Sequence, residues 1–61
     1  MDKVYIIVTE LNGYKNLEPH PAAYAAREDA EAVAEAYRQD GRFDHVGVLE
    51  LLIIGDGYPL L

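Results

Sequence analysis

The residues able to carry out covalent chemistry are few in this 61-residue chain. It contains no serine and no cysteine, and Thr9 is its only threonine. Nucleophilic mechanisms based on serine or cysteine therefore cannot operate within this chain. Thr9 lies in a segment rich in β-branched residues, where an ordinary strand position is the expected one.

The two histidines, His20 and His45, are far apart in the sequence. His45 follows Asp44 and is close to Asp40, a grouping that could suggest an acid–base pair or part of a metal site. A metal site needs three or four ligands in a defined shell, and no clustered spacing supplies them. We therefore predict no catalytic residue, no metal site and no cofactor, with both histidines at surface positions.

The chain is acidic, with a net charge of −6 from 11 acidic and 5 basic residues. Free nucleic acid is a poor partner for such a surface, because binding of the phosphate backbone depends on lysine and arginine. We expect no direct nucleic-acid binding, and a protein or nucleoprotein complex with a basic surface as the better electrostatic match. Solubility alone is the other explanation for an acidic composition.

Acidic residues gather on one side of a predicted helix. They could dock on a basic groove, whereas the alternative is a solvated face that the helix dipole stabilises. No residue of opposite charge four positions further along relieves the repulsion between the last two, which favours an external basic partner. The residues concerned are Glu28, Asp29, Glu31 and Glu35.

A strand over Lys3–Leu11 is the first element expected in the chain. Its residues are mostly β-branched or aromatic, and Asn12-Gly13 follows as a turn signal. The middle of the segment is apolar on both faces, which indicates a central strand rather than an edge strand.

The next segment is more ambiguous. Tyr14–Pro21 contains glycine, asparagine and proline in or beside it and is predicted to be a loop. Ala22–Ala25 could form a short second strand beside the first, since prolines are tolerated at an edge. The alternative is that the helix starts earlier, because alanine favours helices.

The clearest predicted element is a helix over Arg27–Asp40. Small and apolar residues recur at helical spacing and form one stripe, and Gly41 follows as a C-terminal stop. Ala26 occupies the N-cap position, where serine or aspartate would be favourable. The stripe consists of Ala26, Ala30, Val33, Ala34 and Tyr37.

The last predicted strand covers Phe43–Ile54, and Gly55-Asp56-Gly57 closes it. We expect one α+β domain over residues 1–61, with a short, mostly antiparallel sheet of topology ββαβ, strand order 2-1-3, and one helix on one face. The last strand then forms a long apolar edge on which Glu50 is the principal charge. Exposed edges of this kind favour strand addition or dimer pairing.

Size and composition limit how this fold can be stabilised. A chain of this length buries only about 60% of its unfolded surface, and it has no cysteine for disulfides. Self-association is therefore expected more than for a longer chain. The apolar stretches Val4–Val8 and Leu51–Ile54 are too short to span a membrane, and Met1–Val4 is unlike a secretory signal. We expect no membrane association and a location in the cytoplasm of the cell that makes the protein.

Three segments carry a resemblance: Val4–Glu10, Arg27–Val33 and Val48–Leu51. They resemble small uncharacterised α+β proteins of phages and prophages, which pair a "VYVVT"-like strand with an "(S/D)-x-E-x-A-E" helix start. Ala26 stands where that pattern has a capping residue. Some small acidic phage proteins are similar to anti-CRISPR and other anti-defence inhibitors, so the resemblance implies inhibition of a host complex by binding.

The leading hypothesis is a non-enzymatic phage or mobile-element protein that inhibits a host complex, for example a CRISPR–Cas complex, through its acidic helix side. Tyr14 and Tyr58 are further candidate contacts, because exposed tyrosines anchor interfaces. The alternative is a structural module that forms a homodimer through the last strand and the apolar tail Tyr58–Leu61. Its candidate contacts are Val48, Glu50, Leu51 and Ile53.

Overall fold

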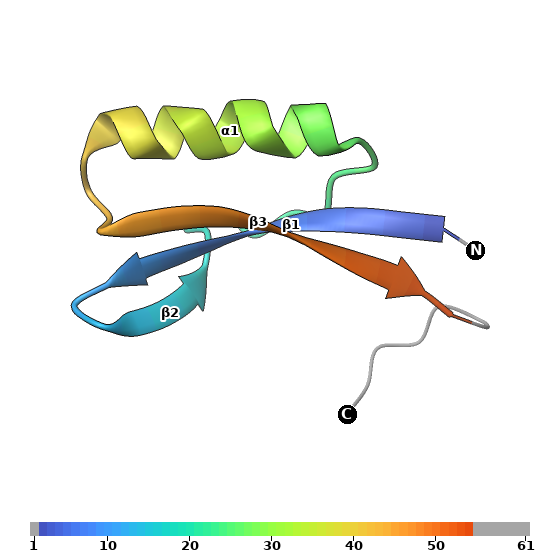
Figure 1. The fold of residues 1–61 in the computed structure, drawn as a ribbon, viewed down its shortest axis with the longest axis horizontal. Coiled ribbons are helices and arrows are strands. Elements are labelled where there is room, and N and C mark those ends of the chain that lie inside the picture. The colour runs from blue at the N-terminus through green and yellow to red at the C-terminus, as the bar shows by residue number, and fades with distance from the viewer. Residues whose placement is uncertain (1, 55–61) are drawn as a thin grey trace.

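The computed structural model describes residues 2–54 and contains two strands, a helix and a third strand (Figure 1). The three strands form one sheet in the order β2-β1-β3, and both outer strands run antiparallel to β1. This confirms the predicted α+β class, its topology and its strand order. The elements are β1 (Asp2–Leu11), β2 (Tyr14–Leu17), α1 (Arg27–Asp40) and β3 (His45–Ile53).

A two-residue turn joins β1 to β2. Asn12 and Gly13 both have positive φ, 54° and 84°, as a type I′ hairpin turn requires. The backbone N–H of Asn12 also donates to Asp44 Oδ2 at 2.9 Å, which ties the turn to the start of β3. The predicted loop is wrong for Tyr14–Leu17, because a two-residue hairpin turn leads directly into the paired strand.

The segment Ala22–Ala25 is not a strand. Only Tyr24 pairs with β1: its backbone N–H and C=O each bond to Tyr5, at 2.8 Å. Between β2 and this bridge the chain leaves β1, at the two prolines, which have no backbone N–H to donate. The predicted second strand is therefore wrong at Ala22–Ala25 apart from one bridged residue.

Helix α1 has the predicted bounds, and it does not begin within the preceding alanines. Ala26 is extended at the N-cap and provides no side-chain hydrogen bond. Gly41 has a φ of 75°, and its N–H donates to the carbonyl of Arg38 at 3.2 Å. Within residues 2–54, no helix is long and apolar enough to cross a membrane.

The core lies between α1 and one face of the sheet. Ala30 and Ala34 are fully buried, and their small side chains let the helix pack closely on Ile7 of β1. Among the described residues, Ile7 is the only large side chain that is fully buried. Partly buried apolar residues complete the cluster: Tyr5, Tyr24, Val33, Tyr37, Val46 and Val48.

The opposite face of the sheet carries no described helix (Figure 1). Side chains alternate along a strand, so residues paired with the even-numbered positions of β1 share this face. Four of its large apolar side chains are 36% to 51% exposed: Leu17, Leu49, Leu51 and Ile53. We call this surface the helix-free face, and its apolar residues are Val4, Ile6, Val8, Leu17, Leu49, Leu51 and Ile53.

The missing N-cap gives a test of the helix boundary. We expect Ala26→Ser to raise the free energy of unfolding by about 1 kcal/mol, because a hydroxyl at an extended N-cap accepts from a free N–H of the first turn. Urea unfolding at one protein concentration measures the change. Ala25→Ser, one residue before the cap, is the control, and equal stabilities of the two variants would contradict the assignment.

Candidate functional site

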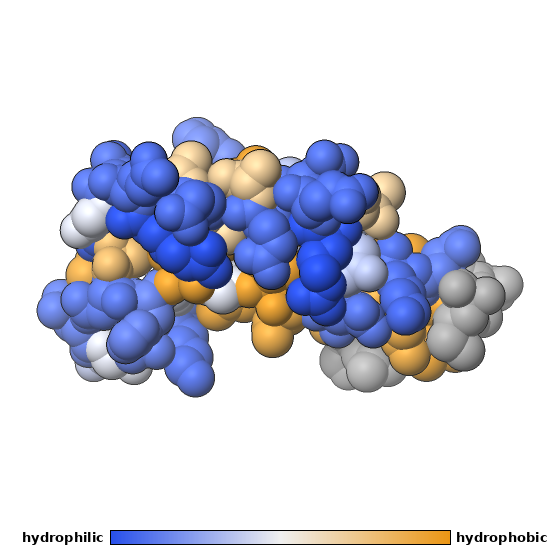
Figure 2. All heavy atoms as spheres, turned by 45° about the horizontal axis from the view of Figure 1, so that its top comes forward, coloured by the Kyte–Doolittle hydropathy of each residue, from blue (hydrophilic) through white to orange (hydrophobic). Residues whose placement is uncertain are grey.

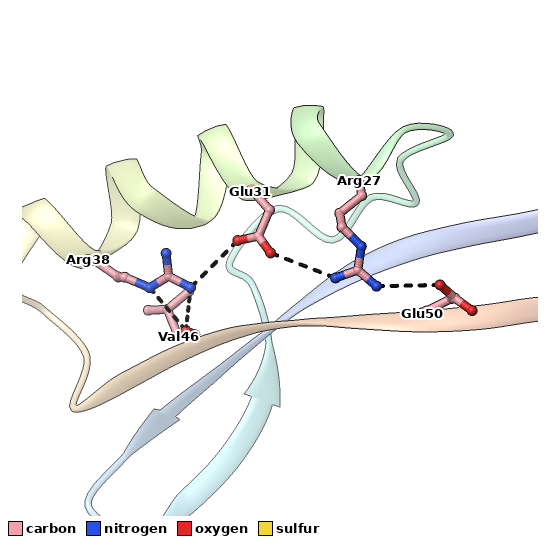
Figure 3. Close-up of polar contacts among 5 residues, drawn as sticks. All are labelled: Arg27, Glu31, Arg38, Val46 and Glu50. Carbon is pink, nitrogen blue, oxygen red and sulfur yellow. Dashed lines mark hydrogen bonds and ion pairs between the residues drawn. The ribbon is translucent and has the colours of Figure 1, made fainter.

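Two of the four acidic residues on this side of α1, Glu31 and Glu35, form ion pairs with arginines of the same helix. Arg27 Nη1 lies 3.8 Å from Glu31 Oε2, and Arg38 Nη2 lies 3.9 Å from Glu31 Oε1 (Figure 3). Arg38 Nη1 lies 3.1 Å from Glu35 Oε1. The expectation that the repulsion between Glu31 and Glu35 lacks an opposite charge is therefore wrong. Arg27 precedes Glu31 by four residues and Arg38 follows Glu35 by three, both spacings that meet on a helix surface.

Glu28 and Asp29 differ from these two residues. Both are exposed in the first turn of α1, and no ion pair among the described residues involves either of them. Hydrophilic residues cover much of α1 on the side shown in Figure 2. The acidic site expected from the sequence therefore narrows to the start of the helix, where the dipole already favours anions.

Of the two candidate tyrosines, only Tyr14 lies among the described residues. It is the first residue of β2 and is 75% exposed, so it lies in a strand rather than in the predicted loop and is not part of the helix. Tyr58, with the rest of the apolar tail Tyr58–Leu61, lies outside the described residues.

Arg38 also holds the outer edge of β3. Its Nε and Nη2 atoms donate to the carbonyl oxygen of Val46 at 3.2 Å and 2.9 Å (Figure 3). Two donors from one rigid guanidinium fix that carbonyl in position. The sequence contains no local signal for this contact, because it joins α1 to a different element.

The direction of the other backbone groups of β3 follows from the pairing of β1. Tyr5 exchanges bonds with Tyr24, and the carbonyl of Ile7 accepts from the N–H of Glu18, so odd-numbered residues of β1 bond away from β3. Even-numbered residues of β1 therefore bond to the odd-numbered residues of β3. The residues of β3 whose N–H and C=O point outward are Val46, Val48, Glu50 and Leu52.

Glu50 connects β3 to both neighbouring elements. Its carboxylate lies 3.6 Å from Lys3 Nζ on β1. It also lies 3.4 Å from Arg27 Nη2 on α1 (Figure 3). The guanidinium of Arg27 lies 5.1 Å from the centre of the Tyr5 ring. All three ion-pairing side chains are partly exposed, so each pair contributes at most about 1 kcal/mol. Glu50 is the one charged residue among the four whose backbone groups point outward, and it already forms ion pairs within the chain.

Glu18 is a buried carboxylate that sequence reasoning did not identify. It is 3% exposed and accepts hydrogen bonds from the hydroxyls of Tyr24 and Tyr37, at 3.2 Å and 3.1 Å. Burial raises the pKa of both tyrosines above 10.0, and the charge and hydrogen bonding of Glu18 raise it further. These bonds satisfy a group that would be costly to bury alone, and they fix the chain between β2 and α1.

The two histidines lie at exposed positions in different parts of the fold. His20 is exposed in the segment between β2 and the bridged residue Tyr24, and His45 is the exposed first residue of β3. Within residues 2–54 no three His, Asp or Glu side chains are grouped so that they could hold a metal ion. A shallow hollow of about 240 Å³ lies beside β1, and its lining is mainly apolar, including Ile6, Leu17 and Ala22.

Comparisons with protein-family models, with curated proteins and with solved structures find no match to this chain. Two surfaces of the described chain are candidates for binding. One is the start of α1, with Glu28 and Asp29, and the other is strand β3, which has an open edge and contributes apolar side chains to the helix-free face.

The Glu18 cluster predicts a dependence of stability on alkaline pH. Because the folded pKa of both tyrosines is raised above 10.0, their contribution to the free energy of unfolding is complete below pH 10. It is lost as the pH rises through the folded pKa values, since the unfolded state then releases its protons first. We expect the fall in stability to be smaller in the double variant Tyr24→Phe, Tyr37→Phe.

Urea unfolding between pH 8 and pH 11 measures this slope. Tyr14→Phe is the control, because it removes an exposed tyrosine hydroxyl outside the cluster. The same slope for the double variant and the control would show that Glu18 does not link these hydroxyls to stability.

Proposed function

We propose that this chain is a non-catalytic protein–protein interaction module that assembles with a second copy of itself through strand β3. The observation that carries the proposal is the contrast between the two faces of the sheet. Among residues 2–54, one face fully buries a single large side chain, Ile7, whereas Leu49, Leu51 and Ile53 of β3 stay substantially exposed on the other face.

The energetics favour a further copy over an isolated chain. The fully buried core of the described chain, one isoleucine and two alanines, is small even for a short domain, and the sequence has no cysteine for a disulfide. Each apolar cross-strand contact between the β3 strands of two copies contributes roughly 0.2–1 kcal/mol. Together with the backbone hydrogen bonds of the paired edges, these contacts offset part of the entropy lost on association.

The edge of β3 supports the same proposal. Native edge strands are usually short or protected by charges, prolines or bulges. Strand β3 has 9 residues and no proline. Glu50 is the single charged residue among those whose backbone groups point away from β1, and it is ion-paired with Lys3 and Arg27. Arg38 donates to the carbonyl of Val46 at the start of this edge. No strand among residues 2–54 pairs with the rest of the edge.

Light scattering on protein separated by gel filtration tests the proposal. We expect the wild-type protein to be dimeric, and Leu51→Lys to raise the dissociation constant at least tenfold, because the change places an ammonium in an apolar contact. Leu11→Lys is the matched control, since Leu11 is 42% exposed but lies at the far end of β1 from Leu51. A wild-type protein that stays monomeric at millimolar concentration would contradict the proposal.

A second candidate function is binding to a basic surface of a host complex, the inhibitory activity that the resemblance to phage proteins implies. The observation that favours it is that Glu28 and Asp29 are exposed and form no ion pair with any other described residue. They offer two negative charges to a partner without first breaking contacts within the chain.

Purification of the tagged protein from lysate with its bound complex tests this candidate. Neutralising the start of the helix with Glu28→Gln, Asp29→Asn should release a partner that has a basic surface. Glu31→Gln, Glu35→Gln is the matched control, because it removes the same charge from residues that Arg27 and Arg38 already neutralise. Equal capture by the two variants would exclude the acidic helix start as the contact.

A further inference from the structure

We infer that β3 pairs antiparallel with β3 of a second copy in a register centred on Leu51. The two sheets then form one continuous six-stranded sheet. This inference rests on the proposed function and specifies the contact. Three features of the described chain select the register: the occupied carbonyl of Val46, the sequence of side chains along β3, and the length of strand that extends past α1.

The contact between Arg38 and the carbonyl of Val46 prevents the first part of the β3 edge from pairing with an added strand. Arg38 donates to it through two nitrogens, so its guanidinium lies where an added strand would place its N–H. Pairing is therefore confined to the outward groups that remain, those of Val48, Glu50 and Leu52. A two-fold axis at Leu51 uses the groups of Glu50 and Leu52 in both copies and does not involve Val46.

The side chains distinguish this register from its neighbours. With the axis at Leu51, the helix-free face brings Leu51 opposite Leu51 and Leu49 opposite Ile53 of the second copy. These are apolar pairs, which stabilise a sheet. An axis at Glu50 would place two Glu50 residues directly opposite each other. An axis at Leu49 would place Leu51 opposite Gly47 and would require the groups of Val46.

Charges on the helix side of the sheet fit the same register. Glu50 then lies opposite Leu52 of the second copy, and the neighbour of Leu52 on β1 is Lys3. The long side chain of Lys3 in one copy can thus approach the Glu50 carboxylate of the other, in addition to its contact within its own chain at 3.6 Å. The interface therefore gains opposite charges rather than like charges.

The helix leaves this part of β3 free. Arg27, the first residue of α1, reaches β3 at Glu50, and the strand continues to Ile53. Figure 1 shows β1 and β3 extending beyond the start of the helix. An axis at Leu51 therefore joins the two extensions and places the two helices towards opposite ends of the combined sheet, where they do not collide.

Single cysteine variants test the register, because the natural chain contains no cysteine. With the axis at Leu51, the Cα atoms of the two Leu51 residues form a non-hydrogen-bonded pair about 4.5 Å apart, within the range of a disulfide. We expect Leu51→Cys to form a disulfide dimer under mild oxidation. Leu49→Cys should not, since the two Leu49 residues are about 13 Å apart in this register.

Proline scanning separates edge pairing from stacking of the two helix-free faces. The N–H of Leu52 points away from β1, so Leu52→Pro removes no bond within the chain but blocks an added strand. We expect this variant to dimerise at least tenfold more weakly than Leu52→Ala, which keeps the N–H. Circular dichroism of both variants checks that the helix and the sheet persist.

The outcomes separate the inference from the proposed function. Cross-linking at Leu51 together with weaker association of Leu52→Pro supports the register. A dimer that cross-links at Leu49 instead, or that associates equally as Leu52→Pro and Leu52→Ala, overturns the register and leaves self-association intact. A wild-type monomer in light scattering, with no cross-link at either position, overturns both.

Discussion

The packing of two alanines of α1 on the centre of β1 is the contact on which the rest of the structure depends. Side chains of a strand alternate between two faces, so turning Ile7 towards Ala30 and Ala34 necessarily turns Ile6 and Val8 the other way. Helix α1, the one helix among residues 2–54, covers only one of these faces. The apolar residues Ile6 and Val8 are therefore left on a face without a helix, which continues onto the exposed residues of β3.

Two arginines of the helix determine which surfaces stay available. Arg27 and Arg38 pair with acidic residues of α1 and also reach β3, through Glu50 and the carbonyl of Val46. These contacts engage Glu31 and Glu35, two of the four acidic residues on that side of α1. The contact with Val46 also occupies the beginning of the β3 edge, so the outward backbone groups of Val48, Glu50 and Leu52 remain open. The electrostatics of the helix and the open edge of the sheet are linked through the same side chains.

Much of the fold could be predicted from the sequence, because local signals agreed with the tertiary structure. The apolar run of β1, the alanine stripe of α1 and the stop at Gly41 needed no long-range information. Strand β2 was missed because its four residues are polar or exposed and depend on the type I′ turn before them. The bridges made by Arg27 and Arg38 and the burial of Glu18 depend on side chains from separate elements, which no single segment reveals.

Amide hydrogen exchange of β3 at several protein concentrations tests the central claim, assembly through the open edge, most directly. The N–H groups of Glu50 and Leu52 point away from β1, so in an isolated chain they face solvent and should exchange rapidly. Our account predicts that both become protected as the concentration rises, while the odd-numbered N–H groups of β3, bonded to β1, are protected throughout. Rapid exchange of Glu50 and Leu52 at every concentration would contradict it.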